Sequence, residues 1–462
     1  MSQRPIMCRI SDLPLLSNGL RLMALCTFVV SLNGCAAMRA ATEQSSPSPA
    51  PLQKEMQRNA FAPPLQKDIE RNLFTIPKGD DVIGRLATVK LEKGDTLPDL
   101  ARHFSLGITA LTAANPEVDL WVPETGKHVI LPLSFILPDA PRKGIVINLA
   151  AMRLFRFKGN GKALAVSTYP VGVGTSEKPT PTGQMHVERK ATRPTWHVPA
   201  SIAEAHKKKG VPLPAKVPPG PLNPLGECAL YLSKASYLIH GTNKPASIGL
   251  QATNGCIRLY PEDVKTLYND TPVDTPVVIV DQPYLIGQRD GVLYLEAHAP
   301  LEGSDSAELE KIINARLRSI EKKWARTLDW RKVKEVQTAA TGIPVPILEM
   351  APVPGKEARK TVEVEHPGKM YGRTELPELR LDAWYVLAAS VRDEVDALRL
   401  AAIINHQGPP IPARVIPKSD SFWVVAGPFD DISEAKDATK RLKIDLGLDG
   451  VLGPPGPPGK KT

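Results

Sequence analysis

The sequence predicts a multidomain protein in which a central, mainly-β domain stands between two small α+β modules. Its 462 residues exceed the length of one ordinary domain. Residues 134–285 alternate short Val/Ile/Leu runs with Pro/Gly turns, the pattern of an all-β region. Residues 85–133 and 380–453 each combine strand patterns with amphipathic helix patterns. Hydrophobic and charged contents of 42% and 23% are typical of globular proteins.

Residues 1–34 have the pattern of a signal peptide. Arginines precede an apolar run at 22–32, which is too short to span a bilayer comfortably. The run ends in Leu32-Asn33-Gly34-Cys35, which resembles a bacterial lipobox and implies lipidation of Cys35. Ala36 in place of an aspartate favours the outer membrane. The alternative is cleavage near 36–41, which would release a soluble periplasmic protein. Residues 35–84, rich in Ser, Pro, Gln and charge, are predicted to be a tether.

Residues 85–133 predict a strand, two helices and a second strand. The first strand is expected to end at Gly94, and Thr96 with Asp99 has the spacing of a helix capping box. Together with Gly-Asp-Thr-Leu at 94–97, this order resembles a LysM domain, which implies binding of N-acetylglucosamine-containing glycans. Pro98 stands where that family usually has tryptophan. The alternative is a structural spacer that packs against the neighbouring domain.

The central region, 134–285, is expected to be mainly β, with one helix after the cysteine. The helix begins at Pro261, where proline and acidic residues are favoured. The Pro-rich segment 194–226 is long enough to suggest a functional lid. The expected strands are 145–149, 163–169, 229–232, 237–240 and 277–280.

Within this region His240 and Cys256 flank a polar, glycine-bearing loop. An unassisted thiol is mostly protonated at neutral pH, and a nearby imidazole can activate it by taking the proton. Gly255 allows close approach of the backbone and is expected to leave amides free to face an oxyanion. Arg258 offers a planar fork for a carboxylate. The string His-Gly-Thr at 240–242 followed by Asn-Gly-Cys-Ile-Arg at 254–258 is specific where a lone Cys/His pair is not.

These residues resemble the active site of the L,D-transpeptidases, the YkuD-type enzymes that cross-link bacterial peptidoglycan, and imply a YkuD-type β-sandwich. The resemblance spans roughly residues 85–347. It makes Cys256 the nucleophile and His240 the base, with the Gly241 carbonyl orienting the imidazole and amides at Gly255 and Cys256 holding the oxyanion. Other segments that carry the resemblance are 137–149, 179–183, 193–196 and 218–226.

The site departs from the family's commonest motif, Ser-His-Gly-Cys, because Thr253-Asn254-Gly255-Cys256 lacks the second imidazole. We expect Asn254, Thr242 and Arg258 to contact substrate, although Arg258 could instead form a structural salt bridge. Cys228 is expected to be a buried free thiol, since a disulfide with Cys256 would disable the nucleophile.

The resemblance implies acyl transfer from a tetrapeptide stem of peptidoglycan to an amine. The acceptor would be the side-chain amine of a second stem or, as the local similarity favours, a lysine of an outer-membrane lipoprotein. Two alternatives remain open. Water could replace the amine, which would make the protein a hydrolase of the lipoprotein–wall bond, or the chain could be a non-catalytic wall-binding scaffold.

Residues 286–347 are expected to extend the catalytic domain, with a strand at 292–298 and a helix from 305 to about 331, before a linker at 348–379. Residues 380–453 predict the order strand-helix-strand-strand-helix. With Gly427-Pro428-Phe429 this order resembles a SPOR domain, which implies binding of peptidoglycan strands that lack stem peptides, at division septa. Ala389-Ser390-Val391 replaces that family's Gly-Ser-Phe. The tail 454–462 is expected to be disordered.

The net charge of +9 and the pI near 9.1 suit anionic partners such as acidic cell-wall polymers or lipid headgroups. No nucleic-acid motif, phosphate-binding loop or metal-ligand cluster accompanies this charge. We therefore expect no nucleic-acid partner, no nucleotide cofactor and no metal.

Overall fold

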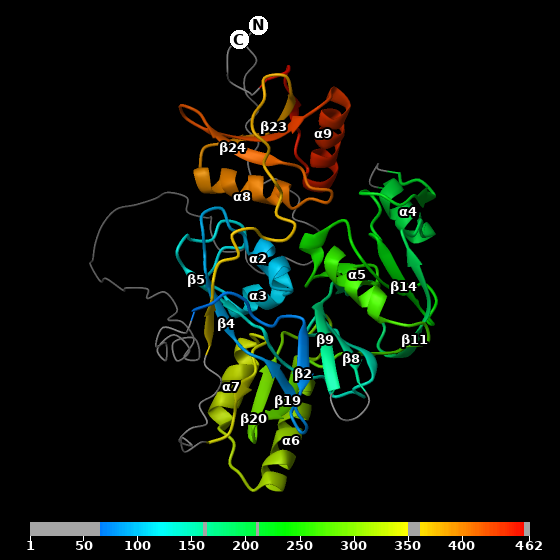
Figure 1. Ribbon diagram of the computed structural model, residues 1–462, viewed down its shortest axis with the longest axis vertical. Coiled ribbons are helices and arrows are strands. Elements are labelled where there is room, and N and C mark those ends of the chain that lie inside the picture. The colour runs from blue at the N-terminus through cyan, green and yellow to red at the C-terminus, as the bar shows by residue number, and fades with distance from the viewer. Residues whose placement is uncertain (1–64, 160–163, 209–211, 350–360, 457–462) are drawn as a thin grey trace, which may run out of the picture.

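The computed structural model describes residues 65–159, 164–208, 212–349 and 361–456. The predicted signal peptide, Cys35 and most of the C-terminal tail lie outside these ranges. Along the long axis the C-terminal domain stands at one end and a helix-and-sheet extension at the other, with the catalytic sheet and a small helical module between them (Figure 1). Within the described residues no helix is long and apolar enough to cross a membrane.

A nine-stranded mixed sheet forms the centre of the molecule, in the order β17-β15-β14-β11-β18-β7-β8-β9-β2. Its long strand β11 pairs with β18 through residues 183–186 and with β14 through residues 187–192, with a register shift between Val187 and Arg189. The predicted sandwich is therefore one continuous sheet whose two halves meet at β11. In chain order the strands are β2 (Leu73–Ile76), β7 (Gly144–Asn148), β8 (Arg153–Lys158), β9 (Leu164–Pro170), β11 (Gly183–Thr192), β14 (Cys228–Leu232), β15 (Leu238–His240), β17 (Ile257–Arg258) and β18 (Pro276–Val280).

Both halves of the sheet contribute to one apolar core, as a mainly-β catalytic domain requires. Ile147 and Leu154 come from one half, and Leu230 and Ile239 from the other. Helix α5 (Pro261–Asp270) buries Val264 and Leu267 in the same core, at about 1.5–3 kcal/mol for each large apolar side chain. All five predicted strands and the predicted helix are present, within two residues of their expected ends. Smaller elements of this domain are β10 (Val173–Gly174), β12 (Trp196–His197), α4 (Ala200–Lys208), β13 (Lys216–Val217), η2 (Pro245–Ser247) and β16 (Gln251–Thr253).

Residues 87–131 form the predicted strand-helix-helix-strand module, with β4 (Ala87–Lys90), α2 (Leu97–His103), α3 (Ile108–Ala114) and β5 (His128–Leu131). The hydroxyl of Thr96 accepts the Asp99 N–H, which confirms the N-cap half of the predicted capping box, and the same hydroxyl donates to the Asp99 carboxylate. The first strand ends at Lys90, four residues before the expected Gly94, because residues 92–95 form a turn.

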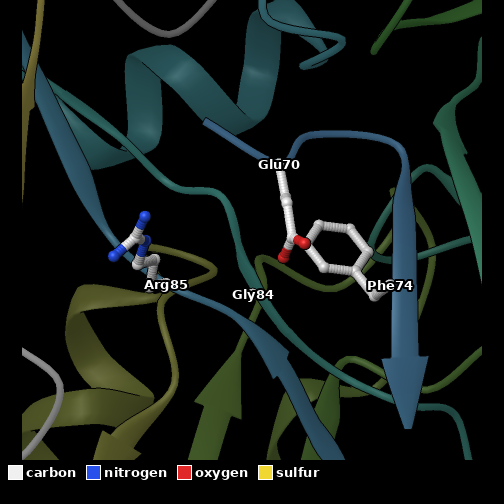
Figure 2. A pocket seen from close by; sticks show the side chains of 4 residues that line it. All are labelled: Glu70, Phe74, Gly84 and Arg85. Atoms are coloured by element: carbon white, nitrogen blue, oxygen red, sulfur yellow. The ribbon is translucent and has the colours of Figure 1, made fainter. Parts of the chain in front are cut away.

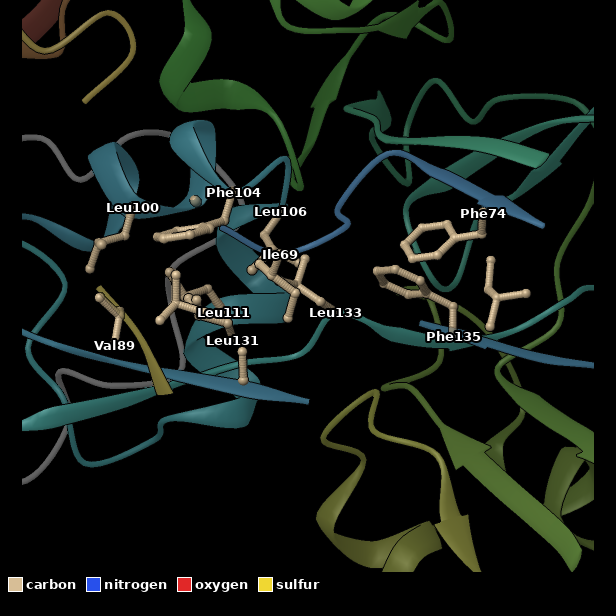
Figure 3. Packing of buried hydrophobic residues seen from close by; sticks show 14 of the residues in the cluster. Ile69, Phe74, Val89, Leu100, Phe104, Leu106, Leu111, Leu131, Leu133 and Phe135 are labelled. Atoms are coloured by element: carbon tan, nitrogen blue, oxygen red, sulfur yellow. The ribbon is translucent and has the colours of Figure 1, made fainter. Parts of the chain in front are cut away.

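The module packs directly on the outer face of the catalytic sheet. Leu100, Phe104 and Leu111 share a core with Phe155 and Val166 of that sheet. In Figure 3 the side chains of this core continue from the two helices of the module toward Phe74 and Phe135. The shared core makes the module part of the catalytic body, as the alternative of a structural spacer expects, and it leaves the resemblance to a LysM domain untested.

The predicted tether 35–84 is wrong for its last twenty residues, 65–84. Strand β2 alternates exposed and buried side chains and pairs with β9 as the edge of the catalytic sheet. Two further strands, β1 (Leu65–Gln66) and β3 (Val82–Gly84), pair with β22 (Val362–Val364) and β6 (Ser134–Ile136). The apolar side chains Ile69, Phe74 and Ile83 give this segment enough buried surface to order it.

The predicted linker 348–379 also contributes to the fold. Its strand β22 lies parallel to β4, between β4 and β1. Val362, Val364 and Met370 are buried in the core of the helical module. These pairings on both sides of β22 join segments far apart in the chain, which a local sequence pattern does not reveal.

The extension at 286–347 begins with a hairpin, β19 (Tyr284–Arg289) and β20 (Val292–Ala297), and β21 (Val345–Pro346) completes its sheet. The single helix expected from 305 to about 331 is wrong. The structure has two helices in this region, α6 (Ser306–Trp324) and α7 (Trp330–Ala339). The first ends because Ala325 adopts a left-handed conformation, and Asp329 caps the start of the second. Buried Leu317 and Val333 hold both helices against β20.

The C-terminal domain has the predicted order, with β23 (Trp384–Val391), α8 (Glu394–Asn405), β24 (Ala413–Pro417), β25 (Phe422–Phe429), α9 (Ile432–Leu446) and a short closing strand β26 (Val451–Leu452). Both helices cover one face of the sheet β24-β25-β23-β26. Helix α8 buries Leu400 and Ile404, while Val395 and Leu398 remain exposed on its outer face.

Candidate active site

Two adjacent parallel strands bring His240 and Cys256 to one end of the catalytic sheet. In the register of β15 and β17, Ile239 lies opposite Ile257 and His240 lies opposite Arg258. Cys256 directly precedes β17, so it enters the site beside the start of β15. The 16-residue sequence separation between histidine and cysteine is thus closed by strand pairing.

His240 is buried and held in one tautomer. Its Nδ1 lies 2.7 Å from the carbonyl oxygen of Gly241, and because a carbonyl only accepts, Nδ1 carries the proton. The lone pair is therefore on Nε2, where a base needs it. Burial and the positive charge of Arg258 lower the pKa of His240 to about 3, against the opposing hydrogen bonds to the backbone of Gly241 and Pro224. At neutral pH the imidazole is uncharged and able to accept a proton.

Cys256 is a free, partly buried thiol that rests in its protonated form. The thiol donates to the carbonyl of Ser236, at 3.5 Å. Burial raises the pKa of Cys256, while the Leu238 backbone amide and the Arg258 charge act in the opposite direction. Both the thiol and the imidazole are therefore uncharged at neutral pH.

Gly255 needs to be glycine because of both its conformation and its surroundings. Its φ is +103°, and a Cβ there would lie 2.9 Å from Cε1 of Tyr237. Thr180 anchors this position. Its hydroxyl donates to the Gly255 carbonyl at 2.9 Å and accepts the Gly174 N–H at 2.9 Å. The segment 179–183, noted in the sequence only as part of a resemblance, therefore shapes the cysteine loop.

The expectation that the Gly255 amide is free to hold an oxyanion is wrong for the resting protein. This N–H donates to the hydroxyl of Thr253 at 3.1 Å, and the same hydroxyl donates to the Cys256 carbonyl at 2.7 Å. The Leu238 amide, which faces the sulfur, is a donor that sequence reasoning missed. Its only sequence signal was its place two residues before His240.

The three residues expected to contact substrate occupy different environments. Asn254 is exposed, whereas the Thr242 side chain is buried and its hydroxyl accepts the Lys244 N–H at 2.9 Å, as a turn cap. Arg258 donates from Nη1 to the hydroxyl of Ser247 at 3.2 Å, and its buried Nε has no hydrogen-bond partner. Within the described part of the chain Arg258 makes no ion pair, so the alternative of a structural salt bridge finds no partner there.

The Pro-rich segment 194–226 contains a helix and a two-stranded hairpin, α4 with β12 and β13. Asn223 ties its two ends together, since its side-chain amide donates to the carbonyls of Pro194, Val217 and Pro218. This arrangement brings Pro224 to His240. The described parts of the segment, 194–208 and 212–226, therefore contribute to the surroundings of His240.

A separate pocket of about 350 Å³ lies where β2, β3 and β4 meet, lined by Glu70, Phe74, Gly84 and Arg85. Figure 2 shows the Glu70 carboxylate beside the Phe74 ring, with Arg85 on the opposite side. None of the residues around Cys256 lines this pocket. No cluster of metal-ligating side chains occurs among the residues with described positions.

Comparison with known proteins agrees with this geometry. Residues 142–279 match the L,D-transpeptidase catalytic domain of the YkuD family, and residues 381–452 match the SPOR domain. A curated relative from Salmonella typhimurium, a probable L,D-transpeptidase ErfK/SrfK, is 35% identical over 272 residues, which cover 57% of this chain and 87% of the relative. The chain belongs to the L,D-transpeptidase family.

Two further relatives come from Escherichia coli and Bacillus subtilis. The probable L,D-transpeptidase YbiS of Escherichia coli is 38% identical over 48% of this chain and 74% of its own length. The putative L,D-transpeptidase YkuD of Bacillus subtilis is 30% identical over 42% of this chain and 99% of its own. Among solved structures, the catalytic domain of an Enterococcus faecium L,D-transpeptidase aligns with 19% identity and a TM-score of 0.24, over 31% of this chain and 99% of that one.

Substituting Arg258 with glutamine is expected to move the acid limb of kcat/KM to higher pH. Arg258 lowers the pKa of His240, and a base loses activity when it protonates, so a higher pKa moves the loss upward. As the pH is lowered past 6.5, we expect kcat/KM of the wild type to stay constant. We expect kcat/KM of the variant to begin to fall at a higher pH than that of the wild type. The check is kcat/KM between pH 4 and 8, with fluorescence confirming the fold. Arg189→Gln, which removes a cation over Tyr231 in the same sheet, is the control. Coincident profiles for Arg258→Gln and the wild type would contradict the assignment.

Proposed function

We propose that this chain is a peptidoglycan L,D-transpeptidase that uses Cys256 to form a thioester with a tetrapeptide stem. The observation that carries the proposal is that the paired strands β15 and β17 bring a protonated thiol and a neutral imidazole to the same end of the sheet, with the Nδ1 proton of the imidazole held by Gly241. Its support is the family match of residues 142–279 and the relatives that are named L,D-transpeptidases.

The first step cleaves the amide that follows the third, L-centred residue of the stem. The Cys256 sulfur attacks the carbonyl carbon while Nε2 of His240 takes the thiol proton. The tetrahedral oxyanion is held by backbone amides around Cys256, including Leu238. Collapse breaks the C–N bond, and His240 returns the proton to the departing D-alanine amine. We assign Arg258 to binding a stem carboxylate, supported by the lack of any ion pair to its guanidinium in the described part of the chain.

In the second step an acceptor amine attacks the thioester, its proton passes through His240, and the thiol is regenerated. The acceptor is a lysine of an outer-membrane lipoprotein or the side-chain amine of a second stem. In the alternative reaction, hydrolysis of the lipoprotein–wall bond, water is the acceptor and Cys256 and His240 have the same roles.

The accessory domains direct this chemistry to the cell wall. We infer that the C-terminal SPOR domain binds peptidoglycan strands and that the module at 85–133, with its strand-helix-helix-strand order, is a LysM module that binds wall glycans. The protein then works in the periplasm, anchored by lipid at Cys35 to the outer membrane and enriched at the division septum.

The proposal is tested by incubating the purified protein with tetrapeptide-rich peptidoglycan and measuring D-alanine release. Release that requires Cys256 is the expected result. Mass spectrometry of products formed with a lysine-bearing lipoprotein peptide, with a second stem, or with neither then identifies the acceptor. Sacculus binding without release would instead favour the non-catalytic scaffold.

A further inference from the structure

The loop that follows the histidine strand, on the way to Cys256, is held by two domains outside the catalytic sheet. This loop, residues 243–249, begins directly after Thr242 and is called here the histidine–cysteine loop. The C-terminal domain contacts its beginning, and the helical module contacts its end. Both contacts join elements far apart in the sequence.

The C-terminal domain touches the loop through a close backbone approach and an ion pair. At Gly408, in the turn after α8, an added Cβ would lie 1.6 Å from the Asn243 carbonyl oxygen and 3.0 Å from the Lys244 Cα. Nζ of Lys244 lies 3.1 Å from Oδ1 of Asp445, near the end of α9. The ion pair is partly exposed and therefore weak alone, whereas the backbone contact fixes the separation of the two domains.

A short chain of hydrogen bonds links this contact to the active site. The Lys244 carbonyl accepts the Ser247 hydroxyl at 2.7 Å, and the Ser247 hydroxyl accepts from Nη1 of Arg258 at 3.2 Å. Arg258 in turn acts electrostatically on both His240 and Cys256. Displacement of Lys244 would therefore move the only hydroxyl that the described structure shows holding the Arg258 guanidinium.

The helical module holds the far end of the same loop. The amide of Ile108, at the start of α3, donates to the Ile248 carbonyl at 3.1 Å. The Thr109 hydroxyl donates to the Gly249 carbonyl, and a Cβ at Gly107 would lie 2.9 Å from the Gly249 Cα. The end of the loop at Ile248 and Gly249 is fixed to the catalytic body through the shared core. A movement of Asn243 and Lys244 therefore changes the backbone between Lys244 and Ser247.

We propose that the C-terminal domain is a positioning element of the active site, in which Gly408 and Asp445 hold the histidine–cysteine loop so that Ser247 keeps Arg258 in place. The inference rests on the proposed transpeptidase function for its kinetic consequence. The C-terminal domain then does more than recruit substrate by binding glycan. Its contact with the histidine–cysteine loop contributes to the rate of acyl transfer, including on stem peptides that carry no glycan.

The test uses full-length protein and a free stem tetrapeptide without glycan, so that recruitment by the C-terminal domain plays no part. Gly408→Ala forces the domain away from the loop, and Asp445→Lys reverses the ion pair. Gly453→Ala is the matched control, since a Cβ there meets nothing within 4 Å. Asp449→Lys is the control for charge, because Asp449 pairs with Lys443 inside the C-terminal domain.

We expect Gly408→Ala to lower kcat about tenfold with KM changed less than twofold, a coupling of ordinary size. Asp445→Lys lowers kcat by a smaller factor, and the swapped pair Lys244→Asp/Asp445→Lys restores it. Both controls keep the wild-type kcat. A wild-type kcat in Gly408→Ala, or a swap that restores nothing, would overturn the positioning role while leaving the transpeptidase assignment intact.

A second measurement is independent of activity. Hydrogen exchange at the amides of Lys244, Ser247 and Ile248 reports directly on the loop, whose internal hydrogen bonds protect them. Faster exchange in Gly408→Ala than in Gly453→Ala is the expected result. Equal exchange in the two variants would contradict the proposal. Absence of D-alanine release by the wild type would count against the transpeptidase function alone.

Discussion

Replacing Cys256 with alanine is expected to reduce D-alanine release from a tetrapeptide stem to background, a loss of roughly a millionfold where chemistry is rate-limiting. Alanine removes the sulfur that, in the proposed mechanism, forms the thioester, and no later step of that mechanism proceeds without it. Cys256 is only partly buried, so truncation leaves the core intact. The measurement is initial D-alanine release at matched protein concentration, with thermal unfolding to confirm the fold.

Cys228→Ala is the matched control for this loss. Cys228 is a free, buried thiol on β14, where it packs among apolar side chains of the catalytic core. Its loss removes a little packing but no reacting atom, so the variant is expected to keep wild-type activity with a slightly lower melting temperature. D-alanine release that persists in Cys256→Ala, or that is lost in Cys228→Ala, would show that Cys256 is not the nucleophile.

Replacing His240 with glutamine is expected to lower kcat by about 100- to 10,000-fold, the usual contribution of a general base. The imidazole is uncharged at neutral pH, since its pKa is lowered to about 3, and Gly241 fixes its Nδ1 proton. Glutamine has similar length but accepts no proton. The loss should appear in kcat more than in KM, because proton transfer belongs to the transition state.

His186→Gln is the control for the histidine substitution. His186 is exposed on β11 of the same sheet, so its replacement changes the surface alone. Steady-state kinetics of both variants on one tetrapeptide decide the matter. If His240→Gln stayed within a few-fold of the wild type, another group would have to be the base.

The elements that the sequence predicted well are those with strong local patterns. The catalytic strands have continuous apolar runs, and helix α5 begins with proline and two acids, so their existence follows from short windows of sequence. The C-terminal domain alternates such patterns, and its order was predicted correctly. His240 and Cys256 were singled out as candidates because their flanking residues form a specific string.

What the sequence did not predict depends on contacts between distant segments. Strand β22 has only three residues and gains its place by pairing with β4, which no local pattern encodes. The hydroxyl of Thr180 that anchors Gly255, and the contact of Gly408 with Asn243, also join separate parts of the chain. The engaged amide of Gly255 was missed because Thr253 is equally compatible with a hydroxyl turned to solvent.

The central claim is that Cys256 forms a thioester with the stem peptide, and mass spectrometry of the covalent enzyme tests it most directly. The protein is mixed with a tetrapeptide stem without an amine acceptor, quenched in acid and digested. The account predicts an added acyl group, equal to the stem less D-alanine, on the peptide that contains Cys256, absent from Cys256→Ala and removed on addition of an amine. Release of D-alanine with no adduct on Cys256, or an adduct on Cys228, would contradict it.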